Sequence, residues 1–230
     1  MERDLVVKLT LGVVPNVLIF AVPLFLPAGT VSWWRAWVIL AGVLIGTAWA
    51  IVELARDHTG LLEERFKPPI QKSQPLADKI LVLLLLVTFL GTLTLTSLDV
   101  FHLHLMRRPD VLVSSLGLIL AVAGCCIAYL GLRENAFAAP VVKYQQERHH
   151  TVVQSGVYSR VRHPMYAGGS LVMFGIPLWL ESYAGALCAV LAVAALIARI
   201  GIEERFLRRE LSDYDAYAEK VRYRLIPLVW

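Results

Sequence analysis

The hydrophobic positions of the chain fall into long runs without a charged residue, and the polar positions gather between these runs. A helix needs roughly 17–25 apolar residues to cross the hydrocarbon core of a bilayer, and each run reaches that length. The runs are Leu9–Trp34, Ala36–Val52, Ile80–Leu98, Val111–Leu132, Pro164–Leu180 and Ser182–Ala198. This pattern predicts an all-α, polytopic integral membrane protein with about six transmembrane helices.

The last two runs lie at the lower edge of this length range, and only Glu181 separates them. They form either two short spans or a tight helical hairpin, and we expect spans. The first run is too long for the apolar core of a cleaved signal peptide, so we expect a retained first helix with a kink or a packing contact near Pro15.

Small residues within the runs suggest where helices pack. Gly42 and Gly46 form a GxxxG pattern, which is typical of close helix packing. Gly168 and Gly169 would let another backbone or a ligand approach closely. The three cysteines, Cys125, Cys126 and Cys188, lie in apolar runs without a metal-binding spacing, and we expect buried, reduced thiols.

The polar connections divide the chain into two regions. Residues 1–132 are expected to form a four-helix membrane region whose loop 56–79 lies at the interface, as a short helix followed by an extended segment after Pro68-Pro69. Residues 133–230 are expected to hold a polar loop, two short membrane helices and an amphipathic C-terminal helix. Ser212, with Asp215 three residues later, predicts a bend in that last helix.

The basic residues are distributed unevenly between the two sides of the membrane. With six crossings, only three of the 22 lysines and arginines, Arg35, Arg107 and Arg108, fall on the side opposite the termini. The positive-inside rule therefore predicts that both termini and the two long connections are cytoplasmic, in a prokaryotic plasma membrane or a eukaryotic endomembrane. Any chemistry is expected on that side, because the opposite loops are short.

The composition limits the classes of function. Hydrophobic residues make up 57% of the chain and charged residues only 17%, so a disordered protein or a soluble enzyme is not expected. A formal net charge of +4 without a basic stripe predicts no nucleic-acid binding. The sequence contains no dinucleotide-binding, phosphate-loop or zinc-protease motif, and we expect no metal centre.

Two segments at the predicted cytoplasmic boundary carry candidate chemistry. Pro164 is suited to the first turn of a helix, which places Arg162 and His163 at its mouth beside free backbone N–H groups, a setting that favours an anionic ligand group. An alternative is a basic loop that only anchors the protein at lipid headgroups. Arg199 lies one helical turn before Glu203, so the two share a face of the helix at the membrane boundary. They are candidate site residues, and the alternative is an ion pair that only marks the end of the span.

The stretch from His150 to Gly168, HTVVQSGVYSRVRHPMYAG, followed by the adjacent Glu203 and Glu204, resembles the RHPxY…EE pattern of the isoprenylcysteine carboxyl methyltransferase family. Membrane phospholipid methyltransferases and some sterol reductases share parts of this pattern. The resemblance covers roughly Ala128–Trp230, and it implies a site for S-adenosylmethionine between the cytoplasmic loop and the tail helix. The residues that it assigns to cofactor binding are His150, Val152, Val153, Gly156, Tyr158, Arg162, His163, Tyr166, Glu203 and Glu204.

The resemblance further implies that Arg199, and less directly Arg209, faces a substrate carboxylate. A carboxylate is already ionised at pH 7 and needs no general base, whereas an amine would need one, for which Glu203 or His163 is suited. We therefore expect a methyltransferase that O-methylates a lipophilic, prenylcysteine-like carboxylate from the bilayer. The alternatives are N- or S-methylation of a lipid amine or small thiol by the same fold, and a non-catalytic membrane scaffold.

Overall fold

The structure, a computed structural model, describes residues 2–71, 74–142 and 150–230, and within these ranges all regular structure is helical. The elements are α1 (Glu2–Ala28), α2 (Trp34–Asp57), α3 (Thr59–Phe66), α4 (Leu76–Leu98), the π-helical turn η1 (Asp99–Leu103), α5 (Val111–Glu134), the 3-10 turn η3 (Gly156–Ser159), α6 (Pro164–Trp179), α7 (Tyr183–Glu210) and α8 (Tyr214–Lys220). The predicted all-α class is confirmed.

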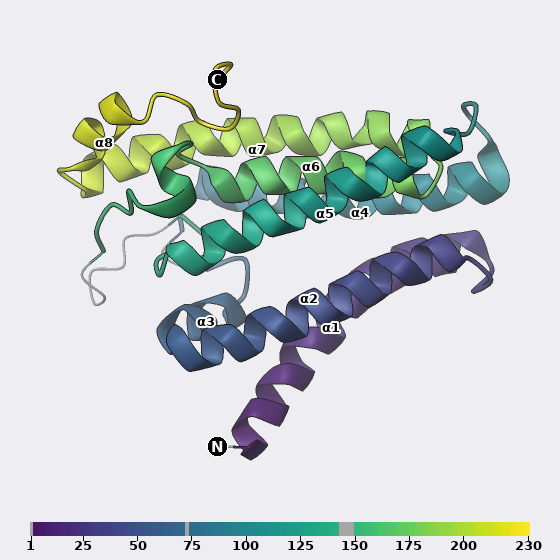
Figure 1. The fold of residues 1–230 in the computed structure, drawn as a ribbon, viewed down its shortest axis with the longest axis horizontal. Coiled ribbons are helices and arrows are strands. Elements are labelled where there is room, and N and C mark those ends of the chain that lie inside the picture. Colours follow the sequence, from purple (N-terminus) through teal and green to yellow (C-terminus); the bar gives the residue numbers. More distant parts are fainter. Residues whose placement is uncertain (1, 72–73, 143–149) are drawn as a thin grey trace.

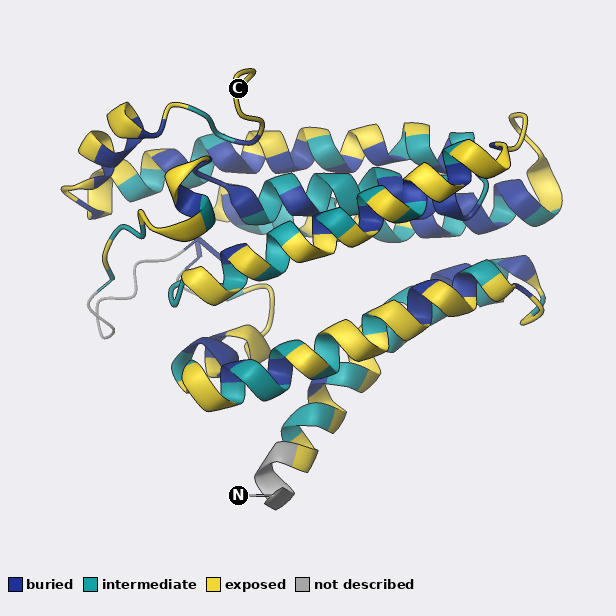
Figure 2. Cartoon of the chain, in the orientation of Figure 1, coloured by how far each residue is buried: buried dark blue, intermediate teal, exposed yellow. Residues whose placement is uncertain are grey.

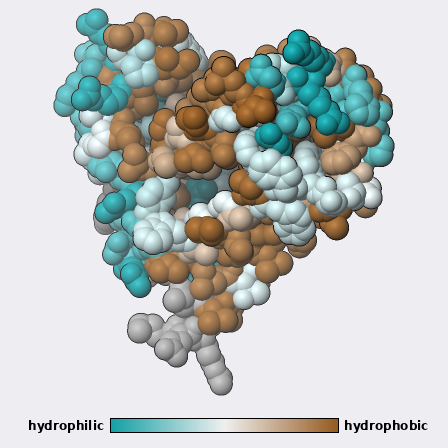
Figure 3. Space-filling view, turned by 45° about the vertical axis from the view of Figure 1, so that its right-hand side comes forward, coloured by the Kyte–Doolittle hydropathy of each residue, from teal (hydrophilic) through white to brown (hydrophobic). Residues whose placement is uncertain are grey.

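Five helices, α1, α2, α4, α5 and α7, are long and apolar enough to cross a membrane. Exposed leucine, valine, isoleucine and tryptophan side chains cover much of their surface, and Figure 3 shows wide hydrophobic areas on one face of the molecule. A surface of this kind is stable only in contact with lipid or another apolar partner. The polytopic membrane architecture is therefore confirmed.

The two helices of the last predicted pair differ in length. Helix α6 has 16 residues and falls short of the other five, whereas α7 has 28 residues. The expectation that the last span is short is wrong, because the polar residues after Ala198 continue the same helix to Glu210 instead of ending it. A bend does follow near Ser212, before α8 begins.

The helices form two groups, which Figure 1 shows one above the other. In the first group α5 packs along α6, and α4 packs along α7; in the second, α2 packs against α1 and α3. Helix α1 also contacts α4, which joins the groups. Figure 1 places α3, α8 and the start of α6 at one end of the molecule, and the α4–α5 connection at the other.

Glycines spaced by seven residues bring α5 and α6 into backbone contact. A Cβ atom added at Gly124 would lie 2.5 Å from the carbonyl oxygen of Gly168, and one added at Gly168 would lie 2.4 Å from that of Gly124. Gly117 of α5 and Gly175 of α6 are similarly close to the backbone of the facing helix. Such small-residue contacts are how membrane helices approach closely, and here they fix the helix that begins at Pro164.

Two expectations about small residues in the membrane are wrong. Around Gly42 and Gly46 of α2 no described atom lies within 4 Å of an added Cβ, because their face of the helix is exposed rather than packed. The close backbone approach expected at Gly168 and Gly169 is, by contrast, confirmed at Gly168, and no described atom lies within 4 Å of an added Cβ at Gly169. Cys125 and Cys126 are free thiols as expected, but they are exposed on α5 and not buried.

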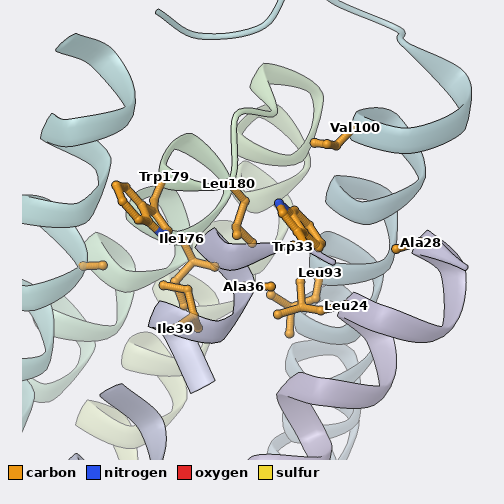
Figure 4. Close-up of a cluster of buried hydrophobic side chains, with 11 residues drawn as sticks. Leu24, Ala28, Trp33, Ala36, Ile39, Leu93, Val100, Ile176, Trp179 and Leu180 are labelled. Carbon is orange, nitrogen blue, oxygen red and sulfur yellow. The ribbon is translucent and has the colours of Figure 1, made fainter. Parts of the chain in front are cut away.

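The end of the molecule opposite α3 and α8 contains the main hydrophobic core. Leu24 of α1, Ala36 of α2, Leu93 of α4 and Leu180 after α6 meet there, together with Trp33, as Figure 4 shows. Figure 2 shows buried positions on the facing sides of the helices at this end. This core leaves the other end of the molecule to the polar residues described next.

Candidate active site

A cavity of about 350 Å³ lies where the loop after α5, the start of α6, the end of α7 and α8 meet. A volume of this size is within the range of small-molecule binding pockets. Polar residues from the loops and from α7 line one part, and aliphatic and aromatic residues from α7 and α8 line another. The segments that line the cavity lie at the end of the molecule that carries α3 and α8 (Figure 1).

Glu204 joins two arginines and a histidine just behind this cavity. Its Oε1 accepts hydrogen bonds from Nε of Arg162, at 2.7 Å, and from Nε2 of His163, at 3.2 Å, when that nitrogen is protonated. Its Oε2 accepts one from Nε of Arg224 at 3.1 Å. Glu204 is 4% exposed and is not among the described residues that line the cavity. A buried carboxylate with this many partners holds the surrounding segments together.

Arg162 fastens the C-terminal segment to the start of α6. Its Nη1 donates to the carbonyl oxygen of Val221 at 2.8 Å and also contacts those of Ala218 and Arg222, at the C-terminal end of α8. A cation at this end of a helix satisfies carbonyl groups that have no partner within the helix. Arg162 N also donates to Tyr223 O at 2.9 Å. The Arg162 side chain therefore supports the wall of the cavity formed by α8.

The polar wall of the cavity consists of stacked rings with ionised groups at their edges. The rings of His163 and Tyr166 are stacked, with centroids 5.5 Å apart. The hydroxyl of Tyr166 donates to Oε2 of Glu203 at 2.5 Å. The guanidinium carbon of Arg199 lies 5.7 Å from the centre of the Tyr166 ring, within the range of a cation–π contact.

Asp78, at the start of α4, holds Arg199 in place. Its Oδ1 accepts a hydrogen bond from Nε of Arg199 at 2.8 Å, and its Oδ2 accepts bonds from the side chain of Gln74 and from the backbone N–H of Val142. Nη2 of Arg199 donates to the carbonyl oxygen of Pro140 at 2.8 Å. Asp78 is fully buried. The carboxylate partner of Arg199 is therefore Asp78, from the N-terminal region, and not Glu203.

The Arg199 guanidinium has one edge, that of Nη1, without a partner in the part of the chain that the structure describes. Among the described residues Nη1 has no hydrogen-bond acceptor, and Arg199 lines the cavity. Arginine binds carboxylates through two neighbouring N–H groups. The free edge of Arg199 is thus suited to an anionic ligand group.

Tyr158 links the loops on the side of the cavity nearest α5. Its hydroxyl accepts a hydrogen bond from Nδ2 of Asn135 at 3.3 Å, and its carbonyl oxygen accepts one from the hydroxyl of Tyr217 at 2.8 Å. Burial raises the pKa of Tyr158 to about 12, so its phenol is neutral at physiological pH. Tyr158 therefore offers the cavity a neutral phenol and not an anion.

Gly156 has a conformational role beside the cavity. Its φ is +54°, and an added Cβ would lie 2.7 Å from the carboxyl group of Glu134, which also accepts a hydrogen bond from Ser155. Glycine is the residue that adopts this backbone conformation at little cost.

Most of the residues expected to form the site do line the cavity: His150, Val152, Val153, Tyr158, Arg162, His163, Tyr166, Arg199 and Glu203. Gly156 and Glu204 support it from outside the lining, and Arg209 is exposed near the end of α7, away from it. The expected roles of these residues remain predictions.

Several residues of the cavity were missed by the sequence analysis. Arg65 of α3 lines it and donates to the carbonyl oxygen of Ala138 at 3.1 Å, and Tyr214 and Tyr217 of α8 line its aromatic part. Asp78 does not line the cavity but holds Arg199, and a signal for it existed, because it is a carboxylate at the start of an apolar run. For Arg65 the sequence contained no such signal, because charged residues are common in a helix that lies at the membrane interface.

Comparison with known proteins finds similarity in the C-terminal half of the chain. Residues 112–213 match the family model described as phospholipid methyltransferase. Protein-S-isoprenylcysteine O-methyltransferase A of Arabidopsis thaliana is 32% identical over 112 residues, which are 47% of this chain and 57% of the relative. The corresponding enzyme of Saccharomyces cerevisiae is 29% identical over 126 residues, covering 49% of this chain and 53% of that protein.

A third relative carries a different name. The cobalt-zinc-cadmium resistance protein CzcN of Cupriavidus metallidurans is 34% identical over 110 residues, which are 46% of this chain and 44% of that protein. The chain spans about half the length of the curated relatives it matches. The resemblance to the isoprenylcysteine carboxyl methyltransferase family is confirmed over this part of the chain.

Proposed function

We propose that this chain, whose C-terminal half resembles the protein-S-isoprenylcysteine O-methyltransferases, is an integral membrane methyltransferase that uses S-adenosylmethionine to methylate the carboxylate of a lipophilic, prenylcysteine-like molecule. The observation that carries the proposal is the free edge of Arg199, held by Asp78 in the same cavity as Glu203. This cavity lies at the end of the membrane helices, where a substrate with a lipid tail and a charged head would have its head.

The residues around the cavity fit S-adenosylmethionine, which combines an amine, a carboxylate, a ribose and a purine. Glu203 supplies an acceptor for an ammonium or hydroxyl group, and the backbone around Val152 and Val153 lies along the lining. Tyr214 supplies a buried hydroxyl without a partner among the described residues. When bound, the cofactor supplies an activated methyl group on its sulfonium sulfur.

The protein's part in O-methylation is to bind, orient and desolvate the carboxylate. Because this group is ionised at neutral pH, no proton has to be removed. The Arg199 guanidinium orients the carboxylate, and its hydrogen bonds to Asp78 and Pro140 limit its own movement. Apolar residues of α8 line one side of the cavity, and displacement of water by a bound substrate beside them would strengthen these electrostatic contacts.

Purified protein in lipid nanodiscs, given methyl-labelled S-adenosylmethionine and a synthetic N-acetyl-S-prenylcysteine, tests the proposal. We expect labelled acceptor whose methyl group is released as methanol by mild alkali, because a carboxyl methyl ester hydrolyses there. Binding of the cofactor without transfer to any carboxylate acceptor would contradict O-methylation.

A phospholipid amine is the second candidate acceptor, favoured by the description of the family model that matches residues 112–213. An amine has to lose a proton, and Glu203 or His163 would accept it. The same labelling with phosphatidylethanolamine vesicles distinguishes the candidates, since an N-methyl group survives alkali. A scaffold without turnover would label neither acceptor.

A further inference from the structure

The segment Ile226–Trp230, which we call the apolar loop, presents large apolar side chains that contact little of the protein. The exposed fractions are 55% for Ile226, 85% for Leu228, 74% for Val229 and 37% for Trp230. The loop contains no charged residue. A single exposed leucine is ordinary, but a group of neighbouring exposed apolar side chains indicates an apolar partner.

The apolar loop has a folded backbone. The amide of Ile226 donates to the carbonyl oxygen of Trp230, and the amide of Trp230 donates to that of Ile226, both at 3.1 Å. The amide of Val229 also donates to Ile226, at 3.2 Å, which closes a turn with Pro227 and Leu228 at its centre. Leu228 has a φ of +67°, which a leucine adopts only at a cost. Because the Leu228 side chain is the most exposed of the loop, contacts within the protein do little to offset this cost.

The apolar loop is fastened beside the start of α6. The backbone N–H of Arg162 donates to the carbonyl oxygen of Tyr223, and that of His163 donates to the carbonyl oxygen of Arg224, both at 2.9 Å. His163 directly precedes α6, a helix without any charged residue. Figure 1 shows the chain turning back after α8 toward the other helices. The loop, which begins two residues after Arg224, is therefore close to the level at which the apolar helices begin.

Basic residues precede the apolar loop. Lys220 and Arg222 are exposed, and no acidic residue lies between Lys220 and Arg224. The guanidinium carbon of Arg224 lies 5.1 Å from the centre of the Trp230 ring, and its Nε donates to Oε2 of Glu204 at 3.1 Å. Anionic lipid headgroups attract basic side chains beside an apolar segment, and tryptophan rings favour the same interface.

We propose that the apolar loop docks on the surface of a bilayer that contains anionic lipids. Its apolar side chains would lie at the boundary of the acyl chains, and Lys220 and Arg222 would contact the headgroups. The position of the loop beside the start of α6 and the sign of the preceding charges both favour this partner. Docking would keep Trp230 against Arg224, and thereby hold Arg224 on Glu204 behind the cavity.

Spin-label accessibility in full-length protein tests the docking. The three native cysteines are replaced by alanine, and one copy is placed in each nanodisc of phosphatidylcholine and phosphatidylglycerol. A nitroxide attached to Val229→Cys should collide more often with oxygen, which concentrates in the bilayer, than with a water-soluble nickel chelate. Glu219→Cys, at an exposed position of α8, is the matched control and should show the reverse preference.

A polar variant tests whether the apolar side chains cause the docking. Adding Ile226→Ser and Leu228→Ser to the labelled Val229→Cys protein should move the label into water, with nickel collisions as frequent as at Glu219→Cys. The bonds to Arg162 and His163 are made by the backbone and should remain. A label that stays in the bilayer would show that these bonds alone set its depth, and would overturn the anchoring role of the side chains.

The remaining outcomes separate a lipid surface from other partners. A label at Val229→Cys as open to nickel as that at Glu219→Cys would overturn the docking. An immobile label shielded from both oxygen and nickel would show that a protein surface covers the loop, and would overturn the choice of lipid. In nanodiscs of phosphatidylcholine alone we expect shallower insertion, and equal insertion would overturn the part assigned to the basic residues.

Discussion

Two adjacent carboxylates near the end of α7 differ in whether they bond to the surrounding fold or face the cavity. Glu203 and Glu204 are adjacent in α7 but have different surroundings: Glu204 is bonded to Arg162, His163 and Arg224, whereas Glu203 faces the cavity and accepts a hydrogen bond from Tyr166. Neighbouring residues of a helix point in different directions, so their substitutions should have separable effects.

Glu204→Gln should reduce stability, and Glu203→Gln should reduce ligand binding. Removing one partner of a buried charge network costs about 3–5 kcal/mol, so we expect a large fall in the melting temperature for Glu204→Gln. For Glu203→Gln we expect a small change in melting temperature and about tenfold weaker binding of S-adenosylhomocysteine, as for a lost charged acceptor. Thermal unfolding and calorimetry on both variants measure these two effects. Equal losses of stability in the two variants would contradict the separate roles of Glu204 and Glu203.

Asp78→Asn should act on the acceptor through Arg199. The amide keeps an oxygen for Arg199 but would point an N–H group toward the donors of Gln74 and Val142. We expect KM for the carboxylate acceptor to rise about tenfold or more, with a smaller change in kcat, because the guanidinium loses its fixed orientation.

Asp99→Asn provides the control at the other end of the same membrane segment. Asp99 is also buried and accepts hydrogen bonds from Ser182 and from the backbone of Leu105. Loss of the Asp99 carboxylate should lower the melting temperature without a selective rise in KM for the carboxylate acceptor. A similar rise in KM in both variants would mean that Asp78 acts only through stability.

Among the helices, α6 depends most on close backbone contact. Its first turn holds Tyr166, and its glycines allow α5 to approach. The GxxxG pattern of α2 did not correctly predict a packed helix face, because that spacing permits close packing but does not supply a partner helix. The seven-residue spacing of glycines in α5 and α6 could have been recognised, since it repeats on both facing helices.

Gly168→Ala should destabilise the α5–α6 pair, and Gly46→Ala should not. The added methyl group at Gly168 meets the carbonyl oxygen of Gly124 and the backbone N–H of Ala128, neither of which can move alone. Overpacking of this kind costs about 1–3 kcal/mol. At Gly46 the methyl group has open space and alanine favours a helix, so stability should be equal or higher. Denaturation in mild detergent measures the stability of both variants. Equal stability of Gly168→Ala and Gly46→Ala would contradict the packing of α5 against α6.

At the scale of the whole molecule, hydrophobic runs predicted the all-α, polytopic architecture, although α6 is shorter than the five helices that are long enough to cross a membrane. Their length and lack of charge decide membrane insertion, which is a local property of the sequence. The candidate site was predicted in part, because residues 150–166 and 199–204 carry a recognisable pattern. Asp78 and Arg65 were missed, because their approach to the cavity depends on how α3 and α4 pack against distant segments.

The predicted sidedness is open to a labelling experiment. Replacing the three native cysteines by alanine and adding Thr30→Cys or Ser212→Cys gives one thiol in the α1–α2 connection or one beside α8. On intact cells a membrane-impermeant maleimide should label Thr30→Cys alone, and lysis should expose Ser212→Cys, because basic segments stay in the cytoplasm. The reverse pattern would contradict a cytoplasmic site.

Alkali-labile methyl transfer to a prenylcysteine by wild-type protein and by Arg199→Ala, prepared in parallel, tests whether the chain methylates a carboxylate that Arg199 holds. We expect transfer by the wild type and a loss of at least about a hundredfold in kcat/KM for the variant, as for a buried charged contact to substrate. Both proteins should bind S-adenosylhomocysteine. Equal turnover in the two proteins would remove Arg199 from the reaction, and the absence of transfer by the wild type would contradict the proposed function.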